Sequence, residues 1–437
     1  MKSIVGIRRE DKSPWERRVP ITPQDAKDLQ VNHDLEIVVQ SSKLRVFEDD
    51  EYTQAGIAVQ ETLAPASIIM GVKEIPLDSF EMGKTYIFFA HVIKGQAYNM
   101  PMLKKMIALG CNLIDYEKVT DEKGRRLIFF GRHAGLAGMI NTLWSYGLRL
   151  AWEGVPNPFT QLKQARHYKD LNQAIMALEQ IKAEIETDGL PASVCPLILG
   201  IAGYGNVSRG AQQILEHLPV IEIDPEEIET IARSADASHH AIYKIVFEEK
   251  HMVKPISPAG TFELQDYYQH PEKYRSKFET YLPNLSILAN AIYWDTMYPR
   301  LVTKEYVQKA YSGGQSPKLK VIGDISCDEE GAIEVTIKAT EPGNPIFVYD
   351  PETGQAKDGH QGQGPLVMAV DILPSEIPRE SSIDFSQVLR DYIPAIAQAD
   401  FSVPFEQLSL PPEIKRAVIL YQGQLAPDYK YIEQFLT

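Results

Sequence analysis

Four apolar stretches of this chain each end on residues that can bind or react. They are residues 67–72 before Lys73, 85–90 before His91, 196–202 before Gly203-Tyr204-Gly205, and 319–325, which holds Asp324 and precedes Asp328. In open parallel α/β sheets, ligands bind outside the carboxyl ends of the strands. A lysine, a histidine, a glycine turn and carboxylates at such ends predict a nucleotide cofactor that faces an acid–base pair.

Short apolar runs alternate with amphipathic stretches over residues 1–130, and the runs expected as strands include 112–115 and 127–130. This alternation predicts βαβ units and a mostly parallel sheet. A second strand–turn–helix–strand series begins at residue 196 and ends near residue 223. We therefore predict the α/β class, with two Rossmann-like doubly wound domains and an active-site cleft between them.

The domain boundaries follow from the longest candidate helix, over residues 134–152, which we expect to cross from the first domain to the second. Residues 1–133 plus 366–437 are predicted to form a substrate-binding catalytic domain, and residues 134–365 the dinucleotide-binding domain. Residues 341–365 are rich in Gly and Pro, which indicates loops with room for one hairpin.

The composition is that of a globular protein of 437 residues with a formal net charge of −15, which does not favour nucleic acid as a partner. No apolar run reaches 18 residues, and the N-terminus has no apolar signal core, so we expect no membrane contact and a cytoplasmic location. Three cysteines lack any metal-ligand spacing, so no metal site is predicted.

The turn Gly203-Tyr204-Gly205-Asn206-Val207 has the pattern of a dinucleotide-binding loop. Its first glycine permits the tight turn, the second lets a pyrophosphate approach the backbone, and the following helix offers free N–H groups. Ser208 stands where the motif has its third glycine, so the placement between an apolar strand and a helix carries the assignment.

Acidic residues beyond the next strand suit the 2′-hydroxyl of an NAD ribose. Glu222 and Asp224 lie 19 and 21 residues after Gly203. Asp224 precedes a proline, so a turn or cap role stays open for it.

The remaining candidates each have a structural alternative. Lys73 could lie at the surface, and His91 could be a satisfied structural residue. Arg18 suits a bidentate contact with a substrate carboxylate, but it could belong to a solvated charge run, and Glu117 and Arg126 share that ambiguity.

A set of segments in order along the chain resembles a known family. The segments are ERRVPITP, GVKE, FAHVIKGQ, LIDYE, GRRLIFFG, AGLAGMIN, GYGNVSRGA, ANAIYWD, IGDISCD and DYKYI. They are similar to the lysine–ketoglutarate reductase domain of aminoadipic semialdehyde synthase and to lysine-forming saccharopine dehydrogenases, within the alanine dehydrogenase and transhydrogenase superfamily. The resemblance runs along nearly the whole chain. It implies that L-lysine and 2-oxoglutarate form an imine, which NAD(P)H reduces to saccharopine.

The resemblance also implies residue roles. Lys73 and His91 match an acid–base pair, while the residues that match groups that tune this pair or hold the substrate are Arg18, Glu74, Glu117, Arg126 and Asp328. The family tends to use NADPH, whereas Glu222 and Asp224 favour NAD, so the choice between NADP and NAD stays open. Arg132 and His133 depart from the uncharged residues expected at their positions.

Two other functions are compatible with the residues. One is a related reductive aminase, such as alanine dehydrogenase or another opine dehydrogenase, in which the same Lys/His pair would serve a different imine. The other is a nucleotide-binding sensor without catalysis. An oligomer is possible in every case.

Overall fold

The chain divides into two compact units, and the computed structural model describes residues 3–314 and 316–436. Unit 1 comprises Met1–Phe130 and Pro378–Thr437, and unit 2 comprises Gly131–Ile377. The C-terminal segment was expected to begin at residue 366. Residues 366–377 instead lie in unit 2, because strand β16 (Leu366–Met368) pairs with two strands of the second sheet.

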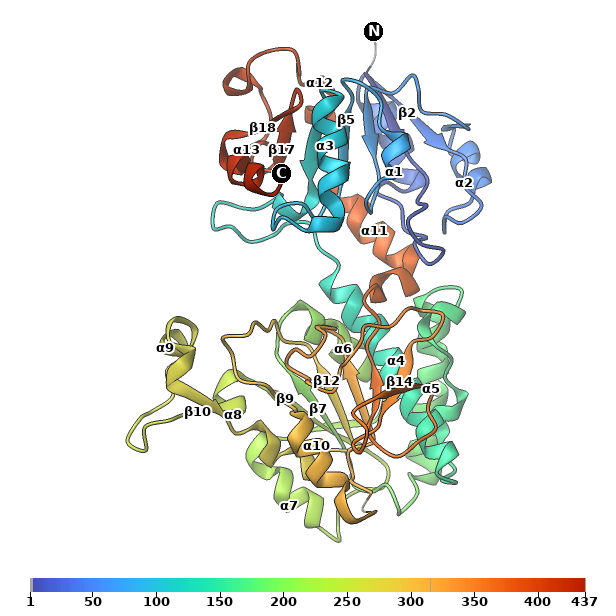
Figure 1. Ribbon diagram of the computed structural model, residues 1–437. Helices are drawn as coiled ribbons and strands as arrows, with labels where there is room; N and C mark the ends of the chain where they lie inside the picture. The colour runs from blue at the N-terminus through green and yellow to red at the C-terminus, as the bar shows by residue number, and fades with distance from the viewer. Residues whose placement is uncertain (1–2, 315, 437) are drawn as a thin grey trace. The chain divides into compact units, whose positions relative to one another are not determined.

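Unit 1 is built on an eight-stranded, mostly parallel sheet (Figure 1). In spatial order its strands are β18 (Gln424–Leu425), β17 (Val418–Tyr421), β6 (Asn112–Asp115), β5 (Thr85–Phe88), β4 (Ile68–Met70), β1 (Ser3–Ile7), β2 (Leu35–Gln40) and β3 (Ala58–Gln60). β17 joins β6 in antiparallel pairing, so the C-terminal segment completes the sheet that the N-terminal residues begin.

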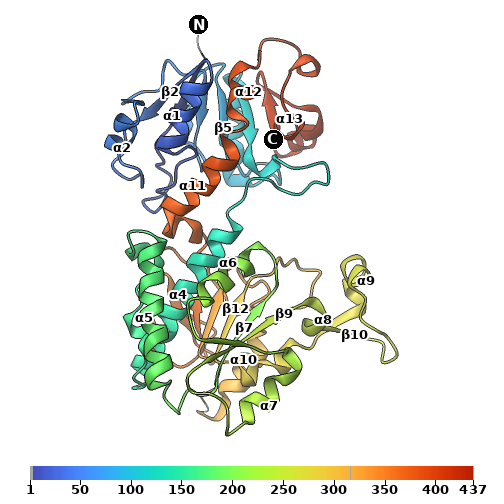
Figure 2. The ribbon, with the colours of Figure 1, turned by 180° about the vertical axis from the view of Figure 1, so that it is seen from behind.

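Helices cover both faces of this sheet. They are α1 (Pro23–Asn32), α2 (Asp49–Gln54), α3 (Met100–Ala108), α11 (Pro378–Leu389), α12 (Ile393–Gln398) and α13 (Pro412–Lys415). In Figures 1 and 2, α3 lies on one face while α11 and α12 lie on the other. The strand predicted over residues 127–130 is absent. Residues 127 and 128 form a bend, and the bridge that precedes them joins Thr120 to Arg126.

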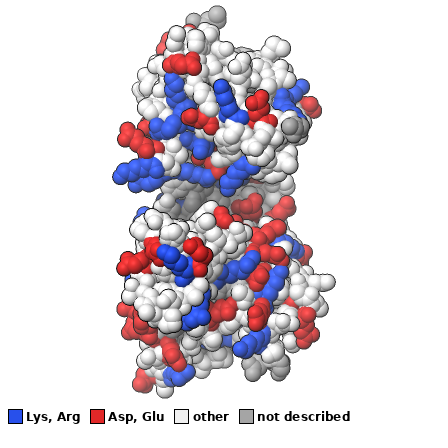
Figure 3. Space-filling model, turned by 60° about the vertical axis from the view of Figure 1, so that its left-hand side comes forward, with Lys and Arg blue, Asp and Glu red and all other residues white. Residues whose placement is uncertain are grey.

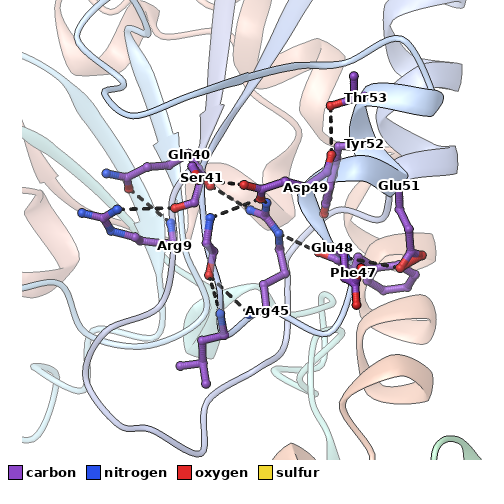
Figure 4. A network of polar contacts seen from close by, with 12 residues as sticks. Arg9, Gln40, Ser41, Arg45, Phe47, Glu48, Asp49, Glu51, Tyr52 and Thr53 are labelled. Carbon is purple, nitrogen blue, oxygen red and sulfur yellow. Dashed lines mark hydrogen bonds and ion pairs between the residues drawn. The ribbon is translucent and has the colours of Figure 1, made fainter.

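A polar network fixes the loop between β2 and α2 (Figure 4). The buried guanidinium of Arg45 donates to the carbonyl oxygens of Gln40 (2.9 Å) and Phe47 (2.8 Å) and pairs with Asp49. Asp49 also accepts from the hydroxyl of Ser41 (2.7 Å). The carbonyl oxygens of Gln40 and Phe47 therefore have hydrogen-bond partners within the loop, as buried backbone groups require.

Unit 2 holds a second eight-stranded sheet. Its order is β15 (Ala356–Asp358), β14 (Ile346–Tyr349), β16, β13 (Val321–Asp324), β12 (Ile287–Asn290), β7 (Leu197–Ala202), β9 (Ile242–Phe247) and β8 (Val220–Glu222). β14 and β15 form the antiparallel hairpin for which the Gly/Pro-rich segment has room. The expected α/β class is confirmed in both units.

Helices lie on both faces of the second sheet as well. α4 (Gly131–Trp152), α5 (Leu171–Asp188) and α6 (Asn206–Leu215) bury apolar side chains against one face. α7 (Ile228–Arg233), α8 (Glu249–Met252) and α10 (Lys304–Tyr311) contribute to the core on the other face. The sheet is therefore doubly wound.

Local sequence explains why α5 forms where it does. The Asp170 side chain accepts from the backbone N–H of Gln173 (2.9 Å) and caps the first turn. Leu178, Ile181 and Ile185 repeat at helical spacing and are fully buried, and Gly189 with a φ of 77° ends the helix.

The residues between β9 and β12 had no predicted elements, and they form an arm that carries α9 (Leu264–Gln269) and the small sheet of β10 (Val253–Pro255) and β11 (Tyr274–Ser276). Figure 1 shows this arm extending from the rest of unit 2. Aromatic rings bind it together, with Tyr267 and Tyr274 5.3 Å apart at their ring centroids.

The surface carries both charge signs: on the face that Figure 3 shows, acidic and basic side chains are intermixed. Among the residues that the structure describes, no helix combines the length and apolar character needed to cross a bilayer.

Candidate functional site

Lys73 and His91 lie at the same edge of the first sheet. Lys73 follows β4, His91 follows β5, and these two strands pair in parallel. Beyond the sheet, the N–H of Phe89 donates to the carbonyl oxygen of Val72 (3.0 Å), which keeps the two segments together. His91 adopts a φ of 48°, a left-handed conformation that is uncommon for a residue other than glycine.

The His91 imidazole is held by a carboxylate. Its Nδ1 lies 2.7 Å from Glu74 Oε1, and Glu74 Oε2 lies 2.6 Å from Lys12 Nζ. Burial opposes ionisation of Glu74, but the hydrogen bonds from His91 and Lys12 outweigh it and hold the pKa of this carboxyl well below its usual range. Because Glu74 is ionised, Nδ1 carries the proton and Nε2 is left to exchange protons with a ligand.

Two buried carboxylates surround the start of the Lys73 segment. Glu10 accepts from the backbone N–H groups of Val72 (2.7 Å) and Lys73 (3.0 Å), and burial raises its pKa to about 7 although Arg8 opposes this. The positive charge of Lys73 contributes to the low pKa of Glu16. Two buried carboxylates, Glu10 and Glu16, therefore lie near the Lys73 segment.

Arg18 is a buried residue and does not belong to a solvated charge run. Only 3% of its side chain is exposed, and its Nε and Nη2 contact the two carboxylate oxygens of Glu16 at 2.7 and 2.5 Å. The guanidinium also lies 4.3 Å from the ring centre of Phe130. Burial raises and Arg18 lowers the pKa of Glu16, and the net result is a pKa below its usual range.

Glu117 and Arg126 form an ion pair beyond the end of β6. Glu117 is nearly buried, whereas about half of the Arg126 side chain is exposed. Asp115, at the end of β6, caps the following turn by accepting from the N–H of Glu117 (2.9 Å), and burial raises its pKa to about 7. Asp115 is the register partner of Phe88 in the parallel pair of β5 and β6, so the Glu117–Arg126 ion pair follows the same edge of the sheet as His91.

In unit 2, the glycine turn leaves an open cradle. Gly203 has a φ of 97°, and its N–H donates to the carbonyl oxygen of Phe247 (2.9 Å). A Cβ on Gly205 would meet nothing within 4 Å, and no side chain caps α6, which begins at Asn206. A pyrophosphate fits such a cradle, because the helix start offers N–H groups and partial positive charge.

In the dinucleotide-binding motif, the third glycine allows a helix to pack closely. In this chain, other glycines allow that close packing. Ser208 is buried, while a Cβ on Gly210 would lie 2.0 Å from the carbonyl oxygen of Arg132, and one on Gly135 would lie 1.9 Å from that of Val207. The backbones of α4 and α6 therefore touch at Gly210, in the segment GYGNVSRGA, and at Gly135, in AGLAGMIN, for which no packing role was predicted.

A cavity of about 340 Å³ adjoins the turn. Besides Gly203, Tyr204 and Gly205, residues from α8, from the start of β10, from α9 and from the loop after β12 line it. Six of the lining side chains are aromatic: Tyr204, Tyr267, Tyr268, Tyr293, Trp294 and Tyr298. Such aromatic faces suit the rings of a nucleotide.

The other predicted residues of unit 2 have partners of their own. Glu222 is exposed and pairs with Lys244 (2.7 Å), and Asp224 caps the short helix of Pro225–Glu227, which is the alternative left open for it. Asp328 is exposed beyond β13. Asp324 is buried among Thr336, Asn290 and the N–H of Cys327, and burial raises its pKa to about 6.

Arg132 and His133, the two departures from the family pattern, open α4 in unit 2. Arg132 contacts Gln213 of α6 through Nε (3.1 Å) and Nη2 (2.8 Å), and His133 is buried.

Comparison with known proteins agrees with the resemblance seen in the sequence. Residues 6–137 match the family described as alanine dehydrogenase/PNT, N-terminal domain. The chain is therefore similar to this family over less than half of its length. Its fold is similar to that of a solved L-alanine dehydrogenase (TM-score 0.63, 15% identity, 99% of this chain and 100% of that one). A transhydrogenase from Sinorhizobium meliloti gives a TM-score of 0.53 at 14% identity and covers 97% of this chain.

Curated relatives extend the likeness to nearly the whole chain. Alpha-aminoadipic semialdehyde synthase, mitochondrial, of Bos taurus is 35% identical over 99% of this chain and 48% of its own length. The synthase of Arabidopsis thaliana is 34% identical over 98% of this chain and 41% of its own length. Saccharopine dehydrogenase [NAD(+), L-lysine-forming] of Emericella nidulans is 28% identical over 88% of this chain and 90% of its own length. The chain spans about half the length of the synthases that it matches.

Several residues that contact the candidate site residues were not predicted from the sequence. Glu10, Lys12 and Glu16 contact the Lys73, Glu74 and Arg18 segments, yet they look like members of a charged N-terminal run. For Glu10 and Glu16 burial is the informative property, and periodicity over so short a loop does not reveal it. Glu249 in the cavity of unit 2 was also missed, because β9, the strand that precedes it, was not predicted.

Proposed function

We propose that this chain is a lysine-forming saccharopine dehydrogenase that interconverts L-lysine plus 2-oxoglutarate and saccharopine with NAD(P)H. The observation that carries the proposal is the chain of contacts Lys12–Glu74–His91 at the strand edge that also bears Lys73. The names of the relatives support the substrates, and the glycine cradle of unit 2 supports the cofactor.

The residues of unit 1 supply the acid–base chemistry of the proposed reaction. Addition of the lysine ε-amine to the keto carbon and loss of water require proton transfers at nitrogen and oxygen. His91, held through Nδ1 by Glu74, exchanges protons at Nε2, and Lys73 provides the second proton-exchanging group. When bound, NAD(P)H supplies the hydride that reduces the imine carbon, and a proton on nitrogen completes the secondary amine.

Charged groups of the same unit would hold the substrate. Saccharopine carries three carboxylates, and guanidinium groups bind carboxylates with matched geometry. Arg126 offers a half-exposed guanidinium, and Arg18 is a second candidate although Glu16 already occupies one of its edges. In unit 2, Gly203, Tyr204, Gly205, Asn206 and Val207 would hold the pyrophosphate, and Asp328 is a candidate near the reacting groups.

The test is oxidation of NADH and of NADPH with 2-oxoglutarate and a panel of amines. L-lysine should give turnover, and mass spectrometry should detect saccharopine. Turnover with ammonia and pyruvate instead would identify an alanine dehydrogenase. Tight nucleotide binding without oxidation for any amine and keto acid would indicate a sensor.

Substitution of Lys73 tests whether this lysine has a chemical role or only contributes a surface charge. Lys73→Met should lower kcat about a hundredfold or more, the range typical of general acid–base groups, while nucleotide affinity is kept. Lys94→Met removes an exposed lysine from a neighbouring loop and should leave kcat within about twofold. Full turnover in Lys73→Met would remove this lysine from the proposal.

A further inference from the structure

The prediction that Glu222 and Asp224 lie near the ribose assumes that β8 is the neighbour of β7. The second sheet has a different strand order. The chain leaves β7, passes through α6 and enters β8, yet β8 does not pair with β7. β9 lies between them and pairs in parallel with β7 along its whole length. Because neighbouring strands lie about 4.8 Å apart, Glu222 stands about two strand spacings from the glycine turn.

The carboxyl end of β9 therefore holds the position that an acidic residue takes in a dinucleotide fold. Phe247, its last residue, is the register partner of Ala202 and accepts the hydrogen bond from the N–H of Gly203 (2.9 Å). The next two residues are Glu248 and Glu249. Either carboxylate follows directly from the strand beside the turn, as ribose recognition requires.

Contacts distinguish these two carboxylates. Glu248 is exposed, caps α8 and pairs with Lys250 (2.9 Å). Glu249 is half-buried and lines the cavity together with Gly203, Tyr204 and Gly205. Its Oε1 accepts from the hydroxyls of Tyr268 (2.6 Å) and Tyr204 (3.5 Å), which leaves its second oxygen for a ligand hydroxyl.

We propose that Glu249, rather than Glu222 or Asp224, accepts the 2′-hydroxyl of the adenosine ribose and makes the site select NADH over NADPH. The proposal rests on nucleotide binding at the glycine turn, as in the proposed function. A 2′-phosphate placed there would meet the carboxylate as a like charge. The nearest cation of this segment, Lys250, is already paired with Glu248.

The test uses the full chain and two probes without nicotinamide, ADP-ribose and 2′-phospho-ADP-ribose, so that the readout is binding and not turnover. Titration calorimetry gives both dissociation constants, and Trp294 in the cavity offers a fluorescence signal. The wild-type chain should bind ADP-ribose at least tenfold more tightly. Glu249→Gln should weaken ADP-ribose about tenfold and bring the ratio of the two constants close to one.

Two matched variants remove a carboxylate elsewhere. Glu248→Gln takes away the adjacent charge and Glu222→Gln tests the rival position, and both should keep the wild-type ratio within about threefold. A ratio that falls with Glu222→Gln and persists in Glu249→Gln overturns the proposal. So does a wild-type chain that prefers the 2′-phosphate, a result that stands even if Glu249→Gln fails to fold.

The experiment distinguishes a failure of the Glu249 proposal from a failure of the proposed function. If the ratio of the two dissociation constants changes as expected but lysine and 2-oxoglutarate give no turnover, the role of Glu249 stands and the proposed reaction fails. If neither probe nor either intact nucleotide binds, the glycine cradle is not a nucleotide site and both proposals fail.

Discussion

Arg18 and Glu16 illustrate how burial changes the meaning of a charged residue. In the sequence they belong to the run ERRVP, whereas in the structure 3% and 1% of their side chains are exposed. A buried ion pair is costly to break, because the remaining charge has neither water nor a partner. Arg18 thus maintains unit 1 as well as being a candidate for carboxylate binding.

Removal of Arg18 should therefore destabilise the protein in a pH-dependent way. Arg18→Met should cost unit 1 about 3–5 kcal/mol at pH 7, because it leaves Glu16 buried and unpaired. In the wild type the lowered pKa of Glu16 contributes stability above its unfolded value, near 4.5, and this contribution is lost as pH falls. Without Arg18, burial outweighs the remaining charge of Lys73 and raises that pKa, so the destabilisation should shrink at acid pH.

Hydrogen exchange of unit 1 peptides in urea would measure this loss. The double variant Glu16→Gln/Arg18→Met supplies the control, since it removes the orphaned charge and should recover part of the stability. An equal cost at pH 4 and pH 7 would contradict the explanation.

At the scale of elements, two crossing helices determine where the glycine turn of unit 2 lies. α6 begins at the glycine turn, and α4 packs against it through Gly135 and Gly210, where the backbones approach too closely for a Cβ. The position of the α6 N-terminus thus depends on glycines outside the binding motif.

A methyl group at this crossing should displace α6. Gly135→Ala should destabilise unit 2 by about 1–3 kcal/mol through overpacking and weaken ADP-ribose binding about tenfold. Gly138→Ala is the comparison on the same helix, because the nearest atoms to its Cβ belong to the Ile325 side chain and not to the backbone of α6. Calorimetric binding and thermal unfolding check both variants, and equal effects would contradict the crossing argument.

At the scale of the whole molecule, the two units differ in how the chain builds them. Unit 2 is one continuous segment, Gly131–Ile377, with hydrophobic cores on both faces of its sheet. Unit 1 needs both ends of the chain: β17 completes its sheet, and the Phe385 ring stacks on Phe130 at 4.8 Å.

Fragments should reflect this difference. Residues 131–377 expressed alone should unfold cooperatively and bind ADP-ribose within about threefold of the full chain, without turnover. Residues 1–130 alone should not fold, because the edge of β6 and the ring of Phe130 lose their partners. Circular dichroism and calorimetry provide the measurements, and an unfolded 131–377 fragment would show that unit 2 depends on unit 1.

The sequence by itself determined the local features. Apolar runs placed strands before Lys73, His91 and Gly203, because side-chain burial and turn residues act over a few positions. The α/β class and the family resemblance followed from the order of these segments.

Only the tertiary structure decided which segments became neighbours. The insertion of β9 between β7 and β8, the burial of Arg18 with Glu16, and the contact of α4 with α6 all join residues far apart in the chain or hidden from water. The free energy of such contacts depends on packing across the whole unit, so no short window of sequence contains it.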